Sequence, residues 1–217
     1  MKSFCIIGLG RFGQTLAKSL VRNGHEVVIV DEDEESINAL ADYVSDAVIG
    51  DPTNEAVLRQ AGVADADCVV ISISNNLNDC IITTLLLKDM GVKKVVVRAN
   101  SDLEWRVLEK VGADMVVFPE KQMGEKLAYT LDKNNVMDHI QFSNEYSIVE
   151  TSAPSQWIGK SMIELNIRRD YGVNVIAVSG EDGKMNISPD PKKPFSAGDT
   201  VTVIGENRNI DKLVKMK

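Results

Sequence analysis

Three glycines near the start of the chain have the spacing of a phosphate-binding turn. The stretch Phe4 to Gly13 reads FCIIGLGRFG, where an apolar run leads into Gly8, Gly10 and Gly13 at G-x-G-x-x-G spacing. Gly8 permits a tight turn out of a strand, Gly10 lets backbone amides approach a pyrophosphate, and Gly13 lets a helix pack closely on the sheet. The N-terminus of that helix adds unpaired N–H groups and a positive dipole end. The spacing predicts a nucleotide site.

An acidic residue after the second apolar run fits the same site. Asp31 ends the run Val27–Val30. Its carboxylate is placed to accept hydrogen bonds from a ribose 2′,3′-diol and to repel a 2′-phosphate. The alternative is that the glycines only form a turn. The strand pattern before them, the helix pattern after them and the acidic partner favour nucleotide binding.

Short apolar runs alternate with amphipathic stretches over residues 1–138, as in repeated βαβ units around a parallel sheet. The predicted strands are Ser3–Ile7, Val27–Val30, Ala47–Ile49, Cys68–Ile73, Val95–Arg98 and Met115–Phe118. The predicted helices are Arg11–Asn23, Glu34–Tyr43, Asn54–Ala61, Leu77–Met90, Leu103–Val111 and Glu120–Asp132. Glycines follow several of them as C-terminal stop signals. The pattern predicts an α/β domain with a Rossmann-like, doubly wound parallel sheet.

Residues 139–217 have a different sequence pattern, which predicts a second, smaller α+β lobe. Short alternating strands are expected at Tyr146–Thr151, Val173–Val178, Met185–Ser188 and Thr200–Ile204. A lobe of this size folds alone only marginally, so burial of one face against a second copy would stabilise it. We therefore expect a homodimer.

Composition excludes several classes of protein. The 217-residue chain carries 24 Lys and Arg against 32 Asp and Glu, and a net charge of −8 disfavours binding to nucleic acid. Its 3 cysteines lack C-x-x-C spacing, which fits a reduced cytosolic compartment. The apolar runs are short and broken by charges, so a membrane role is expected only through a partner.

A dinucleotide fold raises the possibility of an oxidoreductase, but catalytic residues are scarce. His25 follows a helix-ending glycine and His139 lies at the domain boundary, so neither is placed as a general base. Tyr129 and Lys133 form the Y-x-x-x-K spacing of short-chain dehydrogenases, but on a helix that leaves the sheet. The second lobe offers no metal-ligand or acid/base cluster. We therefore favour a sensor over a small NAD-dependent oxidoreductase and predict that the chain is not an enzyme.

The order of its motifs resembles that of one family. The N-terminal motifs are GLGRFG from Gly8, IGDPTNEAVL from Ile49, ISISNN from Ile71, VVRAN from Val96 and GADMVVFPEKQMG from Gly112. The C-terminal motifs are SIVE from Ser147, GKSMIELNIRRDYGVNVIAV from Gly159 and FSAGDTVTVIG from Phe195. Together they resemble the RCK domain, TrkA-N followed by TrkA-C, of regulatory subunits in Ktr and Trk potassium uptake systems.

The resemblance implies a cytoplasmic subunit held on the inner face of the cell membrane by its partner. That partner is a potassium-translocating membrane subunit of the KtrB, KtrD or TrkH type. Homodimers would assemble into an octameric ring whose shape depends on whether ATP or ADP is bound. The alternative within the family is a Trk-type regulator whose main ligand is NAD(H).

The resemblance also implies nucleotide contacts. The arginine of GRFG reaches the γ-phosphate of ATP in this family, and Arg11 and Phe12 occupy that motif. Such a charge-assisted contact contributes about 1.5 to 3 kcal/mol, enough to shift a two-state equilibrium. Alternatively, Arg11 is a solvated first-turn residue. The other implied contacts are Asp31 and Glu32 at the ribose, Asp51 near the adenine, Ser72, Ile73 and Asn75 beside the phosphates and adenosine, and Arg98 as a positive charge.

Glu120, in FPEK, matches the acid that helps to bind a magnesium, calcium or sodium ion near the γ-phosphate. The alternative for Glu120 is an acid at the start of a helix, where the helix dipole favours it. The alternative for Arg98 is a solvated residue at the end of a strand.

The second lobe of Ktr regulators binds cyclic di-AMP at a dimer interface. The matching positions are Arg168 and Asn174, with Met162, Ile163 and Pro189 nearby. The alternative is a dimer-packing strand in which Asn174 caps a turn.

Overall fold

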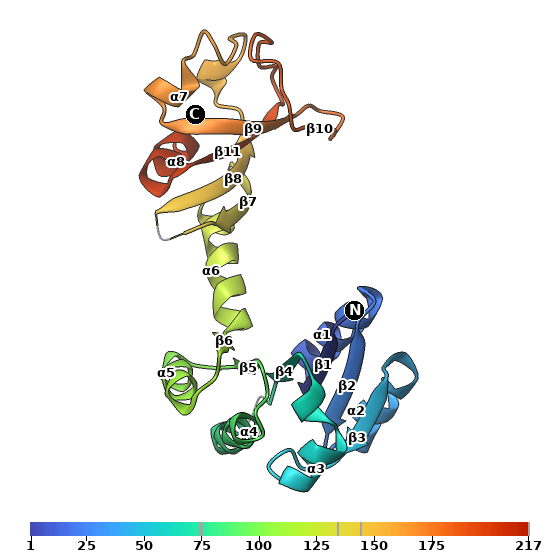
Figure 1. The fold of residues 1–217 in the computed structure, drawn as a ribbon. Helices are drawn as coiled ribbons and strands as arrows, with labels where there is room; N and C mark the ends of the chain where they lie inside the picture. Colours follow the sequence, from blue (N-terminus) through green and yellow to red (C-terminus); the bar gives the residue numbers. More distant parts are fainter. Residues whose placement is uncertain (74–75, 134, 144, 217) are drawn as a thin grey trace. The chain divides into compact units, whose positions relative to one another are not determined.

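The chain forms two compact units, Met1–Glu120 and Lys121–Lys217 (Figure 1). The structure, a computed structural model, describes residues 1–73, 76–133, 135–143 and 145–216. The units divide the chain earlier than the expected boundary after residue 138, because Tyr129 and Lys133 contact His139 and Asp211 of the second unit.

The first unit is built on a parallel sheet with the order β3-β2-β1-β4-β5-β6. The strands are β1 Ser3–Ile7, β2 Glu26–Asp31, β3 Asp46–Ile49, β4 Cys68–Ile71, β5 Val95–Arg98 and β6 Met115–Val117. They cross the lower part of Figure 1, from β3 on one side to β6 on the other. The winding direction reverses between β1 and β4, where doubly wound sheets bind ligands at their carboxyl edge. The predicted doubly wound parallel sheet is confirmed.

Helices connect these strands. They are α1 Arg11–Arg22, α2 Glu34–Asn38, α3 Glu55–Gln60, α4 Leu77–Asp89, α5 Asp102–Val111 and α6 Pro119–Asp132. The helix predicted over Glu34–Tyr43 is shorter than expected, since α2 ends at Asn38 and a 3₁₀ turn follows at Ala41–Tyr43. Leu40, which is fully buried, donates its N–H to the carbonyl of Ile37 at 3.0 Å. This tighter i→i+3 bond turns Leu40 into the core.

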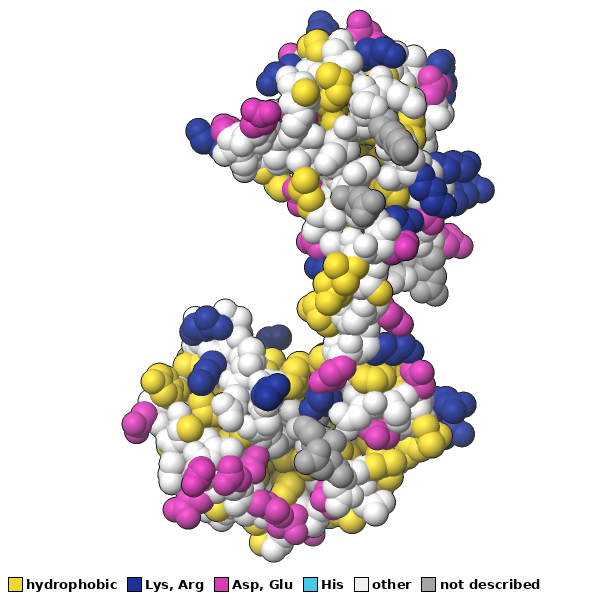
Figure 2. Space-filling view, turned by 180° about the vertical axis from the view of Figure 1, so that it is seen from behind, with side chains coloured by type: hydrophobic (Ala, Val, Ile, Leu, Met, Phe, Trp, Pro, Cys, Tyr) yellow, Lys and Arg dark blue, Asp and Glu magenta, His cyan; other side chains and the backbone are white. Residues whose placement is uncertain are grey.

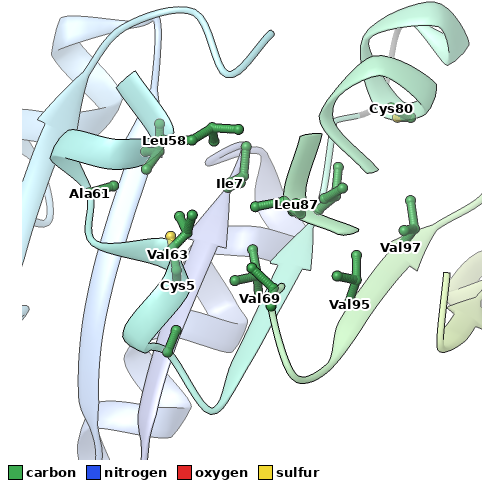
Figure 3. Close-up of a cluster of buried hydrophobic side chains, with 14 of the residues drawn as sticks. Cys5, Ile7, Leu58, Ala61, Val63, Val69, Cys80, Leu87, Val95 and Val97 are labelled. Atoms are coloured by element: carbon green, nitrogen blue, oxygen red, sulfur yellow. The ribbon is translucent and has the colours of Figure 1, made fainter. Parts of the chain in front are cut away.

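Both faces of this sheet are buried. Figure 3 shows Cys5, Ile7 and Val69 of the strands packed with Leu58 of α3 and Leu87 of α4. Ile6 lies between Cys5 and Ile7 in sequence and packs in a separate cluster on the opposite face. Near-continuous apolar strands are typical of a sheet covered by helices on both sides.

The second unit contains an antiparallel sheet with the order β10-β9-β11-β8-β7. The strands are β7 Val136–Gln141, β8 Tyr146–Ser152, β9 Val173–Ser179, β10 Met185–Asn186 and β11 Thr200–Glu206, with helices α7 Ile167–Asp170 and α8 Asn207–Val214. The predicted smaller α+β lobe is confirmed, but β7 was not predicted. Within β7 only Val136 is buried, so the strand lacks the alternating pattern that marks a half-buried strand.

An aromatic cluster forms the centre of the second unit. Trp157 ends a 3₁₀ turn, Ser155–Trp157, and is 0% exposed. Its ring centroid lies 5.2 Å from that of Tyr171, edge to face, and 5.3 Å from that of Phe195. Ile210 and Leu213 of α8 belong to the same core. Large aromatic rings in such geometry contribute strongly to a small core.

Candidate functional site: a cavity at the glycine turn

A cavity of about 330 Å³ lies at the carboxyl ends of β1, β2 and β4, the region expected to bind a nucleotide. It is lined by Gly8, Leu9, Gly10, Asp31, Glu32, Pro52, Ser72, Ile73 and Asp79. Many of the predicted nucleotide contacts are therefore brought together. Asn75, another predicted contact, lies outside the described residues.

Two glycines of the turn, Gly8 and Gly13, leave no room for a side chain. Gly8 has a φ of +91°, and a Cβ on it would lie 2.9 Å from the carbonyl carbon of Ser72. A Cβ on Gly13 would lie 2.0 Å from the carbonyl oxygen of Gly8. The absence of both side chains lets α1 start directly against the loop that follows β1. The turn thus has the close backbone approach that a phosphate cradle requires.

The N-terminus of α1 is open to an anion. Gly10 caps the helix in an extended conformation without a side-chain hydrogen bond, and the first turn has no acidic residue. The first N–H groups of a helix lack intrahelical acceptors. Other helices of this unit have side-chain caps, namely Asp33, Asn54, Asn76 and Ser101. At α1, the unpaired N–H groups and the positive dipole end are available to a phosphate.

Asp31 holds two loops together at the cavity. One carboxylate oxygen accepts a short hydrogen bond from the backbone N–H of Leu9, after β1. The other accepts from the N–H of Asp33 at 2.9 Å, after β2. An ionised carboxylate has about four acceptor sites, so two remain for the hydroxyls of a sugar.

Ser72 places a buried hydroxyl beneath the turn. The residue is 1% exposed, and its backbone N–H donates to the carbonyl of Ile7 at 2.7 Å. Its Oγ has no hydrogen-bond partner among the described residues. A buried hydroxyl without a partner costs free energy. A polar group bound in the adjoining cavity would satisfy it.

Arg11 and Phe12 follow the turn as the first residues of α1 but do not line the cavity. Arg11 is exposed, and its guanidinium makes no hydrogen bond or ion pair with any residue that the structure describes. Phe12 is half-buried. The charge of Arg11 therefore lies in the first turn of α1, at the N-terminal end of the helix.

Asp51 does not line the cavity. Its Oδ1 accepts hydrogen bonds from the hydroxyl of Thr53 at 2.6 Å and from the N–H of Thr53 at 2.7 Å. The hydroxyl bond, followed by the backbone bond, lowers the pKa of Asp51 below its usual range. The carboxylate belongs to a local turn, and its neighbour Pro52 reaches the cavity.

Arg98 and Glu120 meet each other outside the cavity lining. Nη2 of Arg98 lies 2.5 Å from Oε1 of Glu120, and the two side chains are 12% and 58% exposed. A cation that binds Glu120 must compete with this guanidinium. Among the described residues, no cluster of three or more His, Cys, Asp or Glu side chains could hold a metal ion.

Three lining residues were not predicted from the sequence: Leu9, Pro52 and Asp79. Leu9 lies in the GLGRFG motif and Pro52 in the IGDPTNEAVL motif, each next to a residue that was predicted to contact the nucleotide. Their positions in these motifs could therefore have indicated that they line the site. Asp79 lies in the first turn of α4, where an acid is common because it favours the helix dipole. Its place at the cavity depends on how α4 packs.

The residues predicted for cyclic di-AMP fall around two cavities of the second unit. Met162, Ile163, Arg168 and Asn174 line one of about 430 Å³. Pro189, the fifth predicted residue, lines a different cavity. The proline that lines the 430 Å³ cavity is Pro191. Of the four predicted residues there, Ile163, Arg168 and Asn174 are exposed.

Tyr129 and Lys133, the Y-x-x-x-K pair, belong to a polar cluster of the second unit. Nζ of Lys133 lies 2.7 Å from Oδ1 of Asp211, and the ring of Tyr129 stacks on that of His139 at 3.9 Å. Burial, and then the charge of Asp211, raises the pKa of Tyr129 to about 12. A phenol with so high a pKa gives up its proton less readily than an ordinary tyrosine.

We expect the protein to lose stability as the pH falls because of His139. Burial lowers its pKa below the ordinary 6.5, while Asp138 and Asp211 raise it and Lys126 and Lys133 lower it. The unfolded chain then binds more protons, so the stabilisation is complete above the unfolded pKa of 6.5 and is lost as the pH falls from there through the lower folded pKa. Thermal melts between pH 8 and 5 measure it.

The matched variants are His139→Phe, which keeps a ring on Tyr129, and His25→Phe, which changes the other histidine. The pH dependence should flatten in the first variant and persist in the second. Equal profiles for His139→Phe and wild type would contradict the assignment.

No helix in the described parts of the chain is both long and apolar enough to cross a bilayer.

Comparison with known proteins identifies the family. Residues 4–119 match the TrkA-N domain and residues 146–217 match the TrkA-C domain. The chain is 39% identical to Ktr system potassium uptake protein C of Bacillus subtilis, covering 99% of this chain and 96% of the relative. It is 40% identical to protein A of the same system, covering 96% and 94%. These matches confirm the resemblance to RCK regulators.

The fold has solved counterparts. The GsuK channel superposes with a TM-score of 0.70 at 20% identity, covering 99% of this chain. The chain spans 39% of the length of that channel chain. GsuK has also been solved bound to NAD, with a TM-score of 0.68, and to ADP, with a TM-score of 0.52. The relatives are potassium uptake proteins and not enzymes, as predicted. With a TrkA-N domain followed by a TrkA-C domain and this identity over nearly its full length, the chain belongs to the family of Ktr system potassium uptake proteins.

Proposed function

We propose that this chain is a cytosolic regulatory subunit that senses adenine nucleotides and gates a potassium-translocating membrane protein. The glycine cradle carries the proposal, because a Cβ on Gly13 would lie 2.0 Å from the oxygen of Gly8, and a Cβ on Gly8 would lie 2.9 Å from the carbonyl carbon of Ser72. The unpaired hydroxyl of Ser72 and the uncapped N-terminus of α1 fit a bound phosphate. The bound nucleotide supplies charge and shape, and no bond is made or broken.

Different residues of the site bind different parts of the nucleotide. The backbone N–H groups after Gly10 hold phosphate oxygens, Ser72 donates its hydroxyl, and Asp31 with Glu32 holds the ribose. Arg11 extends from the same helix end to the terminal phosphate, so ATP gains a charge-assisted contact that ADP lacks. ATP and ADP thereby favour different shapes of the assembly.

The assembly is a homodimer that builds an octameric ring on a membrane subunit of the KtrB, KtrD or TrkH type. Figure 2 shows hydrophobic side chains along α6. Met123, Leu127 and Leu131 recur at four-residue spacing and are 63%, 54% and 73% exposed. Residues four apart share one helix face, so they form an apolar stripe suited to a second copy. Through its partner the ring lies on the inner face of the membrane.

Two further ligands belong to the proposal. A magnesium, calcium or sodium ion would bind Glu120 together with the nucleotide phosphates, displacing Arg98 from its carboxylate. Cyclic di-AMP would bind at the cavity of Met162, Ile163, Arg168 and Asn174, where two exposed polar side chains adjoin apolar ones.

Arg11→Ala tests the central proposal. By calorimetry on the full-length protein, wild type should prefer ATP over ADP by about tenfold to a hundredfold, and the variant should lose this preference. Arg22→Ala, the same change at the other end of α1, should keep it. Full retention of the ATP preference by Arg11→Ala would refute the assigned role of the guanidinium.

A second candidate is a regulator whose main ligand is NAD(H). It is favoured by Asp31, whose acceptors suit an unphosphorylated ribose, and GsuK, a protein of similar fold, has been solved with NAD. Competition between NADH and ATP separates the two candidates. Mass spectrometry of the nucleotide released from denatured protein identifies the ligand retained from the cell.

A further inference from the structure

We infer that Asp79 recognises the 6-amino group of the base and makes the cavity selective for adenine. The inference rests on the proposed function and adds the residue that reads the base. It concerns a side chain that sequence motifs did not single out.

Asp79 faces the cavity with an unused acceptor. It lies in the first turn of α4, is half-buried and lines the cavity together with Pro52. No hydrogen bond or ion pair joins its carboxylate to a residue within the described ranges. Thr83, one turn further along α4, donates its hydroxyl to the carbonyl of Pro52 at 3.3 Å. Residues four apart share a helix face, so this face of α4 lies against the connection after β3.

The other lining residues leave this part of the cavity for the base. Gly8 and Gly10 form the phosphate end, and Asp31 with Glu32 forms the sugar end. Leu9 and Ser72 also line the cavity, beside the glycine turn, which leaves Pro52, Ile73 and Asp79 as the other described lining side chains. Two apolar side chains suit the faces of a planar ring, and one carboxylate suits a donor on its edge.

Adenine provides that donor. An ionised carboxylate only accepts hydrogen bonds, and the 6-amino group of adenine donates them. Guanine and hypoxanthine carry a carbonyl oxygen at this position, which a carboxylate repels. The chemistry of Asp79 therefore selects one purine over the others.

Asp51 is the competing candidate, since the family resemblance placed it near the adenine. Two hydrogen bonds from Thr53 to its Oδ1 hold this carboxylate in a local turn, and its side chain does not line the cavity. Asp79 does line the cavity, so the base contact is assigned to α4.

The test compares ATP with purine riboside 5′-triphosphate, in which hydrogen replaces the 6-amino group. Calorimetry on the full-length wild type should give about a tenfold to a hundredfold preference for ATP. Asp79→Ala should remove this preference. Asp79→Asn should keep most of it, because its amide oxygen still accepts, and should narrow the gap between ATP and inosine triphosphate, because its amide N–H donates to the carbonyl.

Asp89→Ala is the matched control, since it removes the same charge at the exposed last residue of α4. It should leave the preference intact. Phosphate repulsion is common to both triphosphates and cancels in the ratio. If Asp79→Ala changes both affinities equally, the side chain acts only through its charge and the inference is overturned. If wild type binds neither triphosphate, the proposed function itself fails.

Discussion

Gly13→Ala is expected to abolish nucleotide binding and to destabilise the first unit by about 3 kcal/mol. The new Cβ would lie 2.0 Å from the carbonyl oxygen of Gly8, which is far inside van der Waals contact. The clashing atom belongs to the backbone, so no side-chain rotation relieves the overlap. Either α1 or the loop after β1 must move, and this loop lines the cavity that is proposed to bind the nucleotide.

The measurement pairs chemical denaturation with a nucleotide titration. Gly124→Ala provides the control because it makes the same change in α6, where a Cβ would meet nothing within 4 Å. Alanine is favoured over glycine inside a helix by about 0.5 to 1 kcal/mol, so this variant should be slightly more stable than wild type. A Gly13→Ala protein with wild-type stability and affinity would contradict the geometry of the turn.

Trp157→Ala is expected to destabilise the second unit by about 3 to 5 kcal/mol. The indole is 0% exposed and contacts Tyr171 and Phe195, so its removal leaves a cavity among aromatic rings. A loss of this size lowers the melting temperature of a domain of about 100 residues by roughly 15 °C. Differential scanning calorimetry measures it without relying on tryptophan fluorescence.

Trp157→Phe should cost far less, about 1 kcal/mol. Phenylalanine keeps most of the ring volume and removes the indole N–H, whose Nε1 has no partner among the described residues. Eliminating an unsatisfied buried donor offsets part of the lost packing. Equal destabilisation by the two substitutions would contradict this account of the aromatic core.

The first unit was predictable because its signals are local. Apolar runs specified β1 and β5 to the residue, and glycines after α1 and α5 marked the ends of those helices. The end of α2 was missed, since Leu40 leaves the helix to pack in the core. That is a tertiary effect, which helix periodicity does not contain.

The site was partly predictable for the same reason. Gly8, Gly10 and Asp31 lie in motifs whose spacing alone brings them to one sheet edge. The place of Asp79 at the cavity depends on the packing of α4 against the loop of Pro52, and the hydrogen bonds of Asp51 with Thr53 depend on the local turn that the two residues form. Gly13, expected from the sequence to let the helix pack closely on the sheet, lies where a Cβ would meet the carbonyl oxygen of Gly8, directly after β1.

The bridging carboxylate of Asp31 also bears on the thermodynamics of association. Since one oxygen tethers the segment after β1 and the other tethers the segment after β2, neither segment has to become ordered when a sugar arrives. The conformational entropy that two flexible segments would lose on binding has already been lost during folding. The site is preorganised, so a smaller entropic cost is subtracted from the favourable binding enthalpy.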